Sequence, residues 1–169
     1  MPVTLVGSRV NRIHDRVVVV SREGYGTMMA LAPEARDFSV LIADDEPSSR
    51  ETLRGIVEPL GYKTILAPTG EQAIDIIRSM SIHLALLDLN LPRMSGLDVL
   101  RMARQIIAGL PAILVTADAS VKVMRDAQRE DVFSVIPKPV SRSVVIYTIT
   151  RALAQRYGSV GDNPQAPVA

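Results

Sequence analysis

The chain alternates five times between a short apolar run and a longer segment with helical periodicity. The apolar runs end near Asp44, Ala67, Asp88, Thr116 and Pro137, so by subtraction they recur at intervals of 23, 21, 28 and 21 residues. Each interval is about the length of one strand–helix unit, and such units join parallel strands with helices on both faces of a sheet. The pattern therefore predicts an α/β fold with a five-stranded parallel sheet in the order 2-1-3-4-5.

The expected strands are nearly continuous apolar runs, and each expected helix carries an apolar stripe. The strands are predicted at residues 39–43, 62–67, 82–87, 112–115 and 132–136. The helices are predicted at 47–60, after Thr69, at 96–108, at 118–130 and between Ser141 and Gly158. Thr69 and Ser141 are expected to cap their helices, because a hydroxyl can accept a bond from a free N–H of the first turn.

The texture of the sequence divides the chain into three regions. Residues 1–37 form an N-terminal extension without helical periodicity. We expect it to be a loose leader by default, with a short hairpin or a partner-binding arm as alternatives. Residues 38–157 form the α/β domain, and residues 158–169 form a short, flexible polar tail. No output module is expected, because the tail is too short for a DNA-binding domain.

Composition narrows the functional classes. The chain has no cysteine, which excludes disulfides and thiolate chemistry, and its net charge of +1 gives no attraction to nucleic acid or to a membrane surface. Hydrophobic residues make up 47% of the chain, yet no window reaches the roughly 18 apolar residues of a membrane span, and a secretory signal is missing. A cytoplasmic protein is therefore expected. With only two histidines, carboxylates are the main candidate metal ligands, which favours Mg²⁺ over zinc.

Chemically active side chains stand where the predicted strands end. Asp44 and Asp45 follow the first strand, Asp88 the third, Thr116 the fourth and Lys138 the fifth. In an open parallel sheet these carboxyl ends meet at one edge, and the first and third strands are neighbours. Two carboxylates about 4 Å apart repel each other by roughly 4 kcal/mol at an effective dielectric constant near 20. Such a cluster needs a cation, and an oxygen-only site suits Mg²⁺.

Four motifs carry a family resemblance. In chain order they are Asp44–Asp45, the segment from Asp88 to Gly96, Thr116–Ala117 and Lys138–Pro139. In this order and at this spacing they resemble a response-regulator receiver domain, the phosphoacceptor half of a two-component signalling pair. The resemblance covers about residues 39–157 and implies the flavodoxin-like receiver fold.

The resemblance implies a role for each acidic residue. Asp88 is expected to accept a phosphoryl group from a sensor histidine kinase or a phosphotransfer protein, forming an aspartyl phosphate. Asp45, Asp88 and the backbone carbonyl of Asn90 would bind Mg²⁺, and Asp44 would hold a metal-bound water. Such a protein catalyses its own phosphorylation and dephosphorylation and is not a conventional enzyme.

The same resemblance implies roles for two residues on the later strands. Lys138 would pair with phosphoryl oxygens, and Thr116 would donate a hydrogen bond to one of them. The bond between Lys138 and Pro139 is expected to be cis. Asn90 and Asp118 would flank the water that attacks the phosphorylated aspartate, and their polarity predicts fairly quick self-dephosphorylation.

One position departs from the family pattern. The family usually carries an aromatic residue three positions before the lysine, and here that residue is Val135. Phe133 shares its strand face but lies two positions further back. The phosphorylation chemistry is expected to survive, whereas the signal is expected to travel through the loop after Thr116 and through helix 118–130.

Two rival functions stay open. A degenerate receiver would serve only as a phosphorylation-independent docking module, and the altered position Val135 keeps this alternative alive. An aspartyl-phosphate phosphatase uses similar residues, but it places its nucleophile early in the chain with a second aspartate two positions later, where this chain has Asn90. His83 is interpreted as a structural residue whose ring is hydrogen-bonded.

The expected output is a change in contacts with a downstream protein. The expected surface comprises helix 118–130, the fifth strand and the last helix, and it is also the expected site of any homodimer. Direct binding to nucleic acid or to a membrane is not expected.

Overall fold

The computed structural model describes residues 8–13, 16–21 and 38–158. The chain divides into two compact units, residues 1–36 and residues 37–169, which are described separately. In the first, strands β1 (Ser8–Ile13) and β2 (Arg16–Ser21) pair antiparallel. These two paired strands are the described part of the extension. Expectations for the rest of the extension, and for the tail beyond residue 158, lie outside the described residues.

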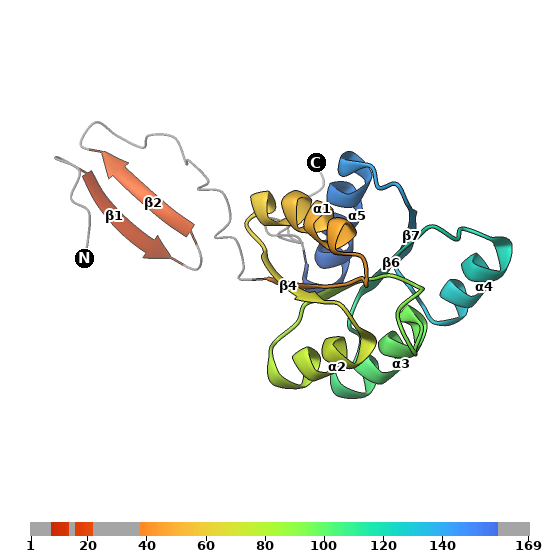
Figure 1. The fold of residues 1–169 in the computed structure, drawn as a ribbon. Helices are drawn as coiled ribbons and strands as arrows, with labels where there is room; N and C mark the ends of the chain where they lie inside the picture. Colours follow the sequence, from red (N-terminus) through yellow and green to blue (C-terminus); the bar gives the residue numbers. More distant parts are fainter. Residues whose placement is uncertain (1–7, 14–15, 22–37, 159–169) are drawn as a thin grey trace, which may run out of the picture. The chain divides into compact units, whose positions relative to one another are not determined.

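The second unit is built on a five-stranded parallel sheet (Figure 1). Its strand order, β4-β3-β5-β6-β7, confirms the predicted order 2-1-3-4-5, because β3 is the first strand of this unit. Strands that follow one another in the chain are joined through helices, as the alternating sequence requires. The strands are β3 (Ser39–Ala43), β4 (Lys63–Ala67), β5 (Leu84–Leu87), β6 (Ala112–Thr116) and β7 (Ser134–Pro137).

Within residues 38–158, five α-helices cover the two faces of this sheet (Figure 1). They are α1 (Pro47–Val57), which continues into the short 3₁₀ helix η1 (Glu58–Leu60), α2 (Gly70–Ser79), α3 (Gly96–Ile106), α4 (Val121–Arg129) and α5 (Arg142–Tyr157). Helices α1 and α5 pack in one hydrophobic cluster, and α2, α3 and one buried residue of α4 pack in the other. No helix within the described ranges is long and apolar enough to cross a membrane.

Successive residues of a strand pack alternately in one hydrophobic cluster and in the other. Leu84 and Leu86 of β5 belong to the α1/α5 cluster, whereas Ala85 and Leu87 belong to the α2/α3 cluster. Because side chains alternate across a pleated strand, a strand covered on both faces must be apolar throughout. This requirement explains the apolar runs of the central strands β5 and β6, whose first polar residues, Asp88 and Thr116, stand at the carboxyl ends.

Some element ends differ from the predictions. The predicted helix at 118–130 begins only at Val121, because Ser120 is its N-cap and its hydroxyl accepts a bond from the Val123 N–H at 3.4 Å. The last strand covers 134–137 rather than 132–136. Thr69 caps α2 as predicted, accepting from the Gln72 N–H at 3.2 Å.

The predicted cap at Ser141 is only half right. Ser141 holds the N-cap position of α5, but its side chain makes no capping hydrogen bond. Its hydroxyl lies 3.1 Å from the Ser143 hydroxyl instead.

Gly96 fixes the turn that follows β5. A Cβ atom placed on Gly96 would overlap the backbone carbonyl oxygen of Asp88. Helix α3 therefore begins directly against the strand end that carries Asp88, and only a residue without a side chain permits this approach. By contrast, Gly55 lies on the exposed side of α1, and a methyl group added there would meet open space, so nothing opposes a larger residue.

Replacing these two glycines should have opposite effects on stability. Gly96→Ala should lower the free energy of unfolding by about 1–3 kcal/mol, since the backbone must shift to admit the methyl group. The matched control Gly55→Ala should raise it by about 0.5–1 kcal/mol, since alanine is the better helix former. Urea unfolding measures both. Equal effects of the two substitutions would contradict the close packing of α3 on β5.

His83 lies at the opposite end of the sheet from Asp88, just before β5. Its Nδ1 atom accepts a hydrogen bond from the Ser39 N–H at 3.0 Å, which confirms the interpretation of a structural, hydrogen-bonded ring. The ring packs against Phe38 and Tyr157, at centroid distances of 5.3 and 5.6 Å. Burial lowers the pKa of His83 below its ordinary value of 6.5, so the fold favours the neutral ring.

The stability of the domain should therefore depend on the charge of His83. Because its folded pKa is below 6.5, the unfolded chain binds more protons in the window between the two values, and stability should fall as the pH drops through that window. His83→Asn keeps an acceptor near the Nδ1 position without titrating. The urea midpoint of this variant should fall less than that of the wild type between about pH 7.5 and about pH 5. Parallel pH profiles of the two proteins would refute this role of the ring.

Candidate functional site

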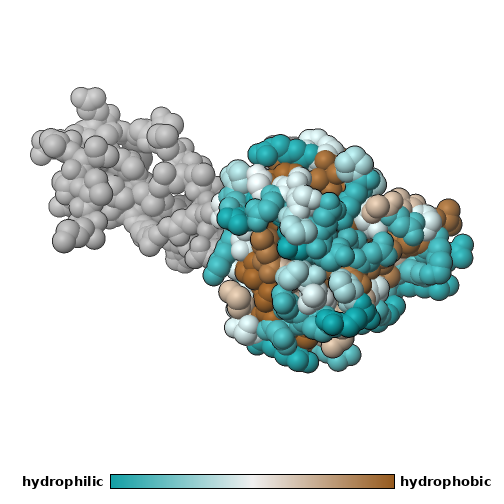
Figure 2. Space-filling view, in the orientation of Figure 1, coloured by the Kyte–Doolittle hydropathy of each residue, from teal (hydrophilic) through white to brown (hydrophobic). Residues whose placement is uncertain are grey.

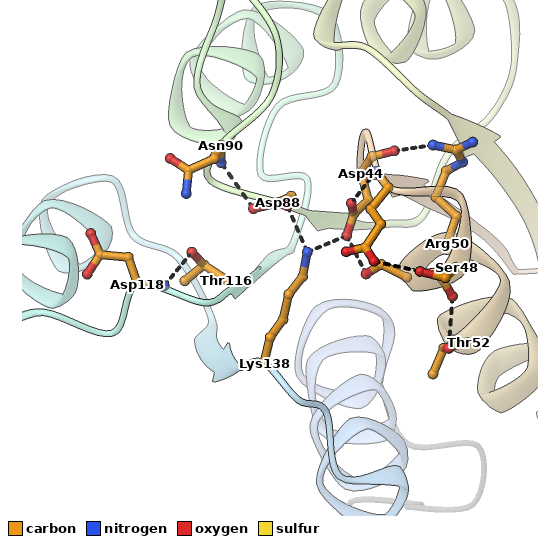
Figure 3. A network of polar contacts seen from close by, with 11 residues as sticks. Asp44, Ser48, Arg50, Thr52, Asp88, Asn90, Thr116, Asp118 and Lys138 are labelled. Carbon is orange, nitrogen blue, oxygen red and sulfur yellow. Dashed lines mark hydrogen bonds and ion pairs between the residues drawn. The ribbon is translucent and has the colours of Figure 1, made fainter.

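Four strand ends bring the predicted site residues together, as Figure 3 shows for Asp44, Asp88, Thr116 and Lys138. Asp44 follows β3, Asp88 follows β5, Thr116 ends β6 and Lys138 follows β7. Backbone bonds hold these ends in register: the Asp88 N–H donates to the Ala43 carbonyl at 2.8 Å, and the Lys138 N–H donates to the Thr116 carbonyl at 2.9 Å. The site therefore rests on the sheet itself rather than on free loops.

Three carboxylates form the centre of the site. One oxygen each of Asp44, Asp45 and Asp88 lies within 4.8 Å of the others. Asp44 and Asp88 are buried, with only 1% and 7% of their surface exposed, whereas Asp45 is exposed. An oxygen-only set of this kind, partly buried and partly open to water, fits a hard divalent cation such as Mg²⁺, which keeps several waters when bound.

Lys138 supplies the positive charge that the buried acids need. Its Nζ atom lies 2.7 Å from Oδ2 of Asp44 and 2.8 Å from Oδ2 of Asp88. Partial burial lowers the pKa of this lysine, but hydrogen bonds to Asp44 and Asp88 outweigh that effect, so its pKa stands above the ordinary 10.5. The ammonium group is therefore charged at neutral pH and bridges the two buried acids. The Lys138–Pro139 peptide bond is cis, as predicted.

Residues at the start of α1 also donate hydrogen bonds to Asp44, and these bonds were not predicted from the sequence. The Glu46 N–H donates to Oδ1 of Asp44 at 2.9 Å, and the Ser49 hydroxyl donates to Oδ2 at 2.5 Å. The Arg50 guanidinium donates to the backbone carbonyl of Asp44 at 2.6 Å. The available signal was the spacing, because a residue five or six positions after a strand end can lie in the first turn of the next helix, facing back to that end.

The loop after β5 carries Asn90. Its backbone N–H donates to Oδ1 of Asp88 at 3.0 Å, which orients the Asp88 carboxylate, while its side chain is exposed. Asn90 and Asp45 both line a shallow surface hollow of about 430 Å³ beside the acidic cluster. A ligand approaching Asp88 from solvent can therefore meet both residues.

Thr116 is completely buried at the end of β6. Its Oγ1 accepts a bond from the Asp118 N–H at 3.1 Å, and the Asp118 carboxylate accepts one from the Ser120 N–H at 2.9 Å. Because Ser120 caps α4, an unbroken run of hydrogen bonds joins Thr116 to the N-terminus of that helix. Asp118 is exposed, and its side chain lies on the far side of Thr116 from Lys138 (Figure 3).

Val135 lies beside α4 rather than at the acidic cluster. It lines a groove of about 580 Å³ between α4 and β7. Phe133, which lies just before β7, lines the same groove. The groove has a mixed lining, in which apolar side chains alternate with polar ones, and the other lining residues are Val121, Met124, Arg125, Ala127, Gln128, Val132 and Ser134. Hydrophobic residues reach the surface at this α4 end of the domain (Figure 2).

Comparison with known sequences places this site in a family. The model of the response regulator receiver domain matches residues 40–150. The sensor histidine kinase RcsC of Escherichia coli is 32% identical over 114 residues, which cover 68% of this chain and 12% of RcsC. The transcriptional regulatory protein ZraR of Klebsiella oxytoca is 26% identical over 139 residues, which cover 74% of this chain and 31% of ZraR. The chain thus matches less than a third of the length of either relative.

Solved structures agree. The CheY-like receiver domain protein from Methanospirillum hungatei JF-1 superposes with a TM-score of 0.67 at 28% identity, covering 70% of this chain and 95% of that one. The signal receiver domain of an HD domain-containing protein from Pseudomonas fluorescens Pf-5 gives a TM-score of 0.69 at 23% identity, covering 73% and 100%, and supports the fold alone. With the sheet order, the strand-end residues and the match over residues 40–150 in agreement, the chain belongs to the response regulator receiver domain family.

Proposed function

We propose that the receiver domain accepts a phosphoryl group on Asp88 from a histidine kinase or a phosphotransfer protein. The observation that carries this proposal is the bridging of the buried acids Asp44 and Asp88 by one lysine, Lys138, beside the exposed acid Asp45. In the transfer, the P–N bond to the donor histidine breaks as a P–O bond to an Asp88 oxygen forms, and the donor imidazole, which already carries a proton on its other ring nitrogen, leaves as the neutral ring.

The acidic cluster would hold Mg²⁺ during this transfer. Asp45, Asp88 and the backbone carbonyl of Asn90 are the proposed ligands, with Asp44 holding a metal-bound water. When bound, the ion neutralises part of the charge on the phosphoryl oxygens. The donor set supports this assignment, because one oxygen from each of three carboxylates converges within 4.8 Å, and the single charge of Lys138 offsets only one of their three negative charges.

Two further residues would stabilise the product. Lys138 turns its ammonium group toward the phosphoryl oxygens, since Asp88 gives up part of its charge on esterification. The Thr116 hydroxyl still has its proton to donate, because its bond from the Asp118 N–H uses only an acceptor position. The phosphorylated state therefore draws Lys138 and Thr116 toward the same point.

The run of bonds from Thr116 through Asp118 and Ser120 to α4 supports an output through that helix. Only Val123 and Ala127 of α4 are buried, so the helix can shift at small cost. We propose that the α4–β7 groove, together with α5, is the surface on which a downstream protein or a second copy of the chain docks.

The wider setting follows from this chemistry. We propose that the reaction takes place in the cytoplasm, because it needs a donor phosphorylated on histidine and a supply of free Mg²⁺. We further propose that residues 38–157 act as the receiver module, with residues 1–37 as a separate extension and 158–169 as a tail. The docking-module alternative rests on Val135 alone, and a complete acid–lysine cluster would have no use in such a module.

Phosphorylation can be tested with a small phosphodonor, acetyl phosphate, and Mg²⁺. The wild-type mass should rise by that of one phosphoryl group, and chelation of Mg²⁺ should abolish the gain. Asp88→Asn should show none, while Asp75→Asn, on the exposed surface of α2, should label like the wild type. Labelling of Asp88→Asn would move the acceptor elsewhere, and an unlabelled wild type would favour the docking module.

Self-dephosphorylation should depend on Asn90, whose exposed side chain lies beside Asp88. Asn90→Leu replaces a polar group that can orient the attacking water by an apolar one of similar size. The phosphorylated variant should lose its phosphoryl group about tenfold more slowly, which corresponds to about 1.4 kcal/mol in the barrier. Intact mass after removal of the phosphodonor measures this rate. Faster loss in the variant would contradict the assignment.

A further inference from the structure

Ser49 makes a contact that the proposed chemistry does not yet use. Its hydroxyl, on the first turn of α1, donates to Oδ2 of Asp44 at 2.5 Å. The same oxygen accepts from Nζ of Lys138 at 2.7 Å, while Oδ1 accepts from the Glu46 N–H at 2.9 Å. Within the described part of the chain, Ser49 and Lys138 are thus the two donors to Oδ2.

Phosphorylation of Asp88 would change the set of hydrogen-bond donors around Asp44. If Lys138 turns toward a phosphoryl group on Asp88, its bond to Asp44 lengthens or is lost. Asp44 is only 1% exposed, so bulk water does not reach it to replace the lysine. Without Ser49, Oδ2 would then have no protein donor, and a buried carboxylate oxygen that lacks one is unfavourable, so the cost would oppose the movement of Lys138.

The rest of the α1 start cannot take the place of Ser49. The Ser48 hydroxyl is turned away and donates to Oε1 of Glu46 at 2.6 Å in an exposed position. Arg50 donates to the backbone carbonyl of Asp44, not to its carboxylate. Figure 3 shows Ser48 and Arg50 on the α1 side of Asp44, opposite Lys138.

We propose that Ser49 is a positioning residue that keeps Asp44 hydrogen-bonded when Lys138 moves to the phosphoryl group. It acts through Asp44 and does not touch the reacting atoms. Without a phosphoryl group, Lys138 remains on Oδ2 and the serine is dispensable. In the phosphorylated state it becomes the remaining side-chain donor to Oδ2, while the Glu46 N–H stays on Oδ1. This inference rests on the proposed function, because it requires a phosphoryl group on Asp88.

The test uses fluoroberyllate, a stable mimic of a phosphoryl group, at saturating Mg²⁺. Ser49→Ala should bind it about tenfold more weakly than the wild type, a change of about 1.4 kcal/mol in binding free energy. Ser49→Thr keeps the hydroxyl and should bind within about threefold of the wild type, and so should the matched control Ser48→Ala. Calorimetry with Mg²⁺ alone should give similar affinities for all four proteins.

Three results would overturn the proposal. They are wild-type fluoroberyllate affinity in Ser49→Ala, an equal loss in Ser48→Ala, and a tenfold loss of affinity for Mg²⁺ alone in Ser49→Ala, since the last would make the serine a general support of the metal site. Failure of the proposed function gives a different pattern. In that case wild type does not bind fluoroberyllate, or Asp88→Asn binds it equally well.

Discussion

The Lys138 ammonium group, held between Asp44 and Asp88, is the interaction on which the site depends. Two buried carboxylates at neighbouring strand ends would drive the sheet edge apart, and their repulsion at about 4 Å is roughly 4 kcal/mol at an effective dielectric constant near 20. Lys138, 94 positions after Asp44 in the chain, offsets this repulsion with its positive charge. Its strand, β7, is separated from β3 by β5 and β6, so only a long side chain with a charge at its tip can reach back to Asp44.

The same geometry explains what could be predicted from the sequence. Strands buried on both faces leave apolar runs, and the polar residues after these runs mark strand ends, so the positions of Asp44, Asp88, Thr116 and Lys138 could be inferred. The sheet order followed from the repeated strand–helix alternation, which is typical of a doubly wound sheet. The helix starts were harder to predict where more than one side chain could act as the N-cap. Ser120 rather than a residue near Asp118 begins α4, and Ser141 occupies a cap position without making the bond. Ser49 was missed because its contact depends on the angle at which α1 leaves β3.

Val135 lies between two parts of the domain that differ in packing: the closely packed strand ends that carry the acids and the sparsely buried helix α4. The strand ends that carry the acids are held by backbone ladders and close contacts such as that of Gly96 on Asp88, and this rigidity suits chemistry by positioning. An aromatic residue at position 135 would have filled space between β7 and α4. With valine there, a groove lies between these elements, lined also by Val121, which is 75% exposed. The groove belongs to a sparsely buried helix, since α4 has two buried residues whereas α3 and α5 have five each.

This contrast indicates how a small change at Asp88 could be passed on. The rigid strand ends cannot move far when Asp88 is phosphorylated. The change is therefore passed on through a hydrogen-bonded contact between the site and a loosely packed element that can move. The hydrogen bonds that link Thr116 with Asp118 and Asp118 with Ser120 meet that description, because they follow one another directly and end at the cap of α4. A helix whose first turn is held by a single serine at 3.4 Å responds to a displacement of that serine more readily than one with a full capping box, such as α3. Under the proposed function, the hydrogen bonds that link Thr116, Asp118 and Ser120 are therefore the route we propose from the acidic centre to α4.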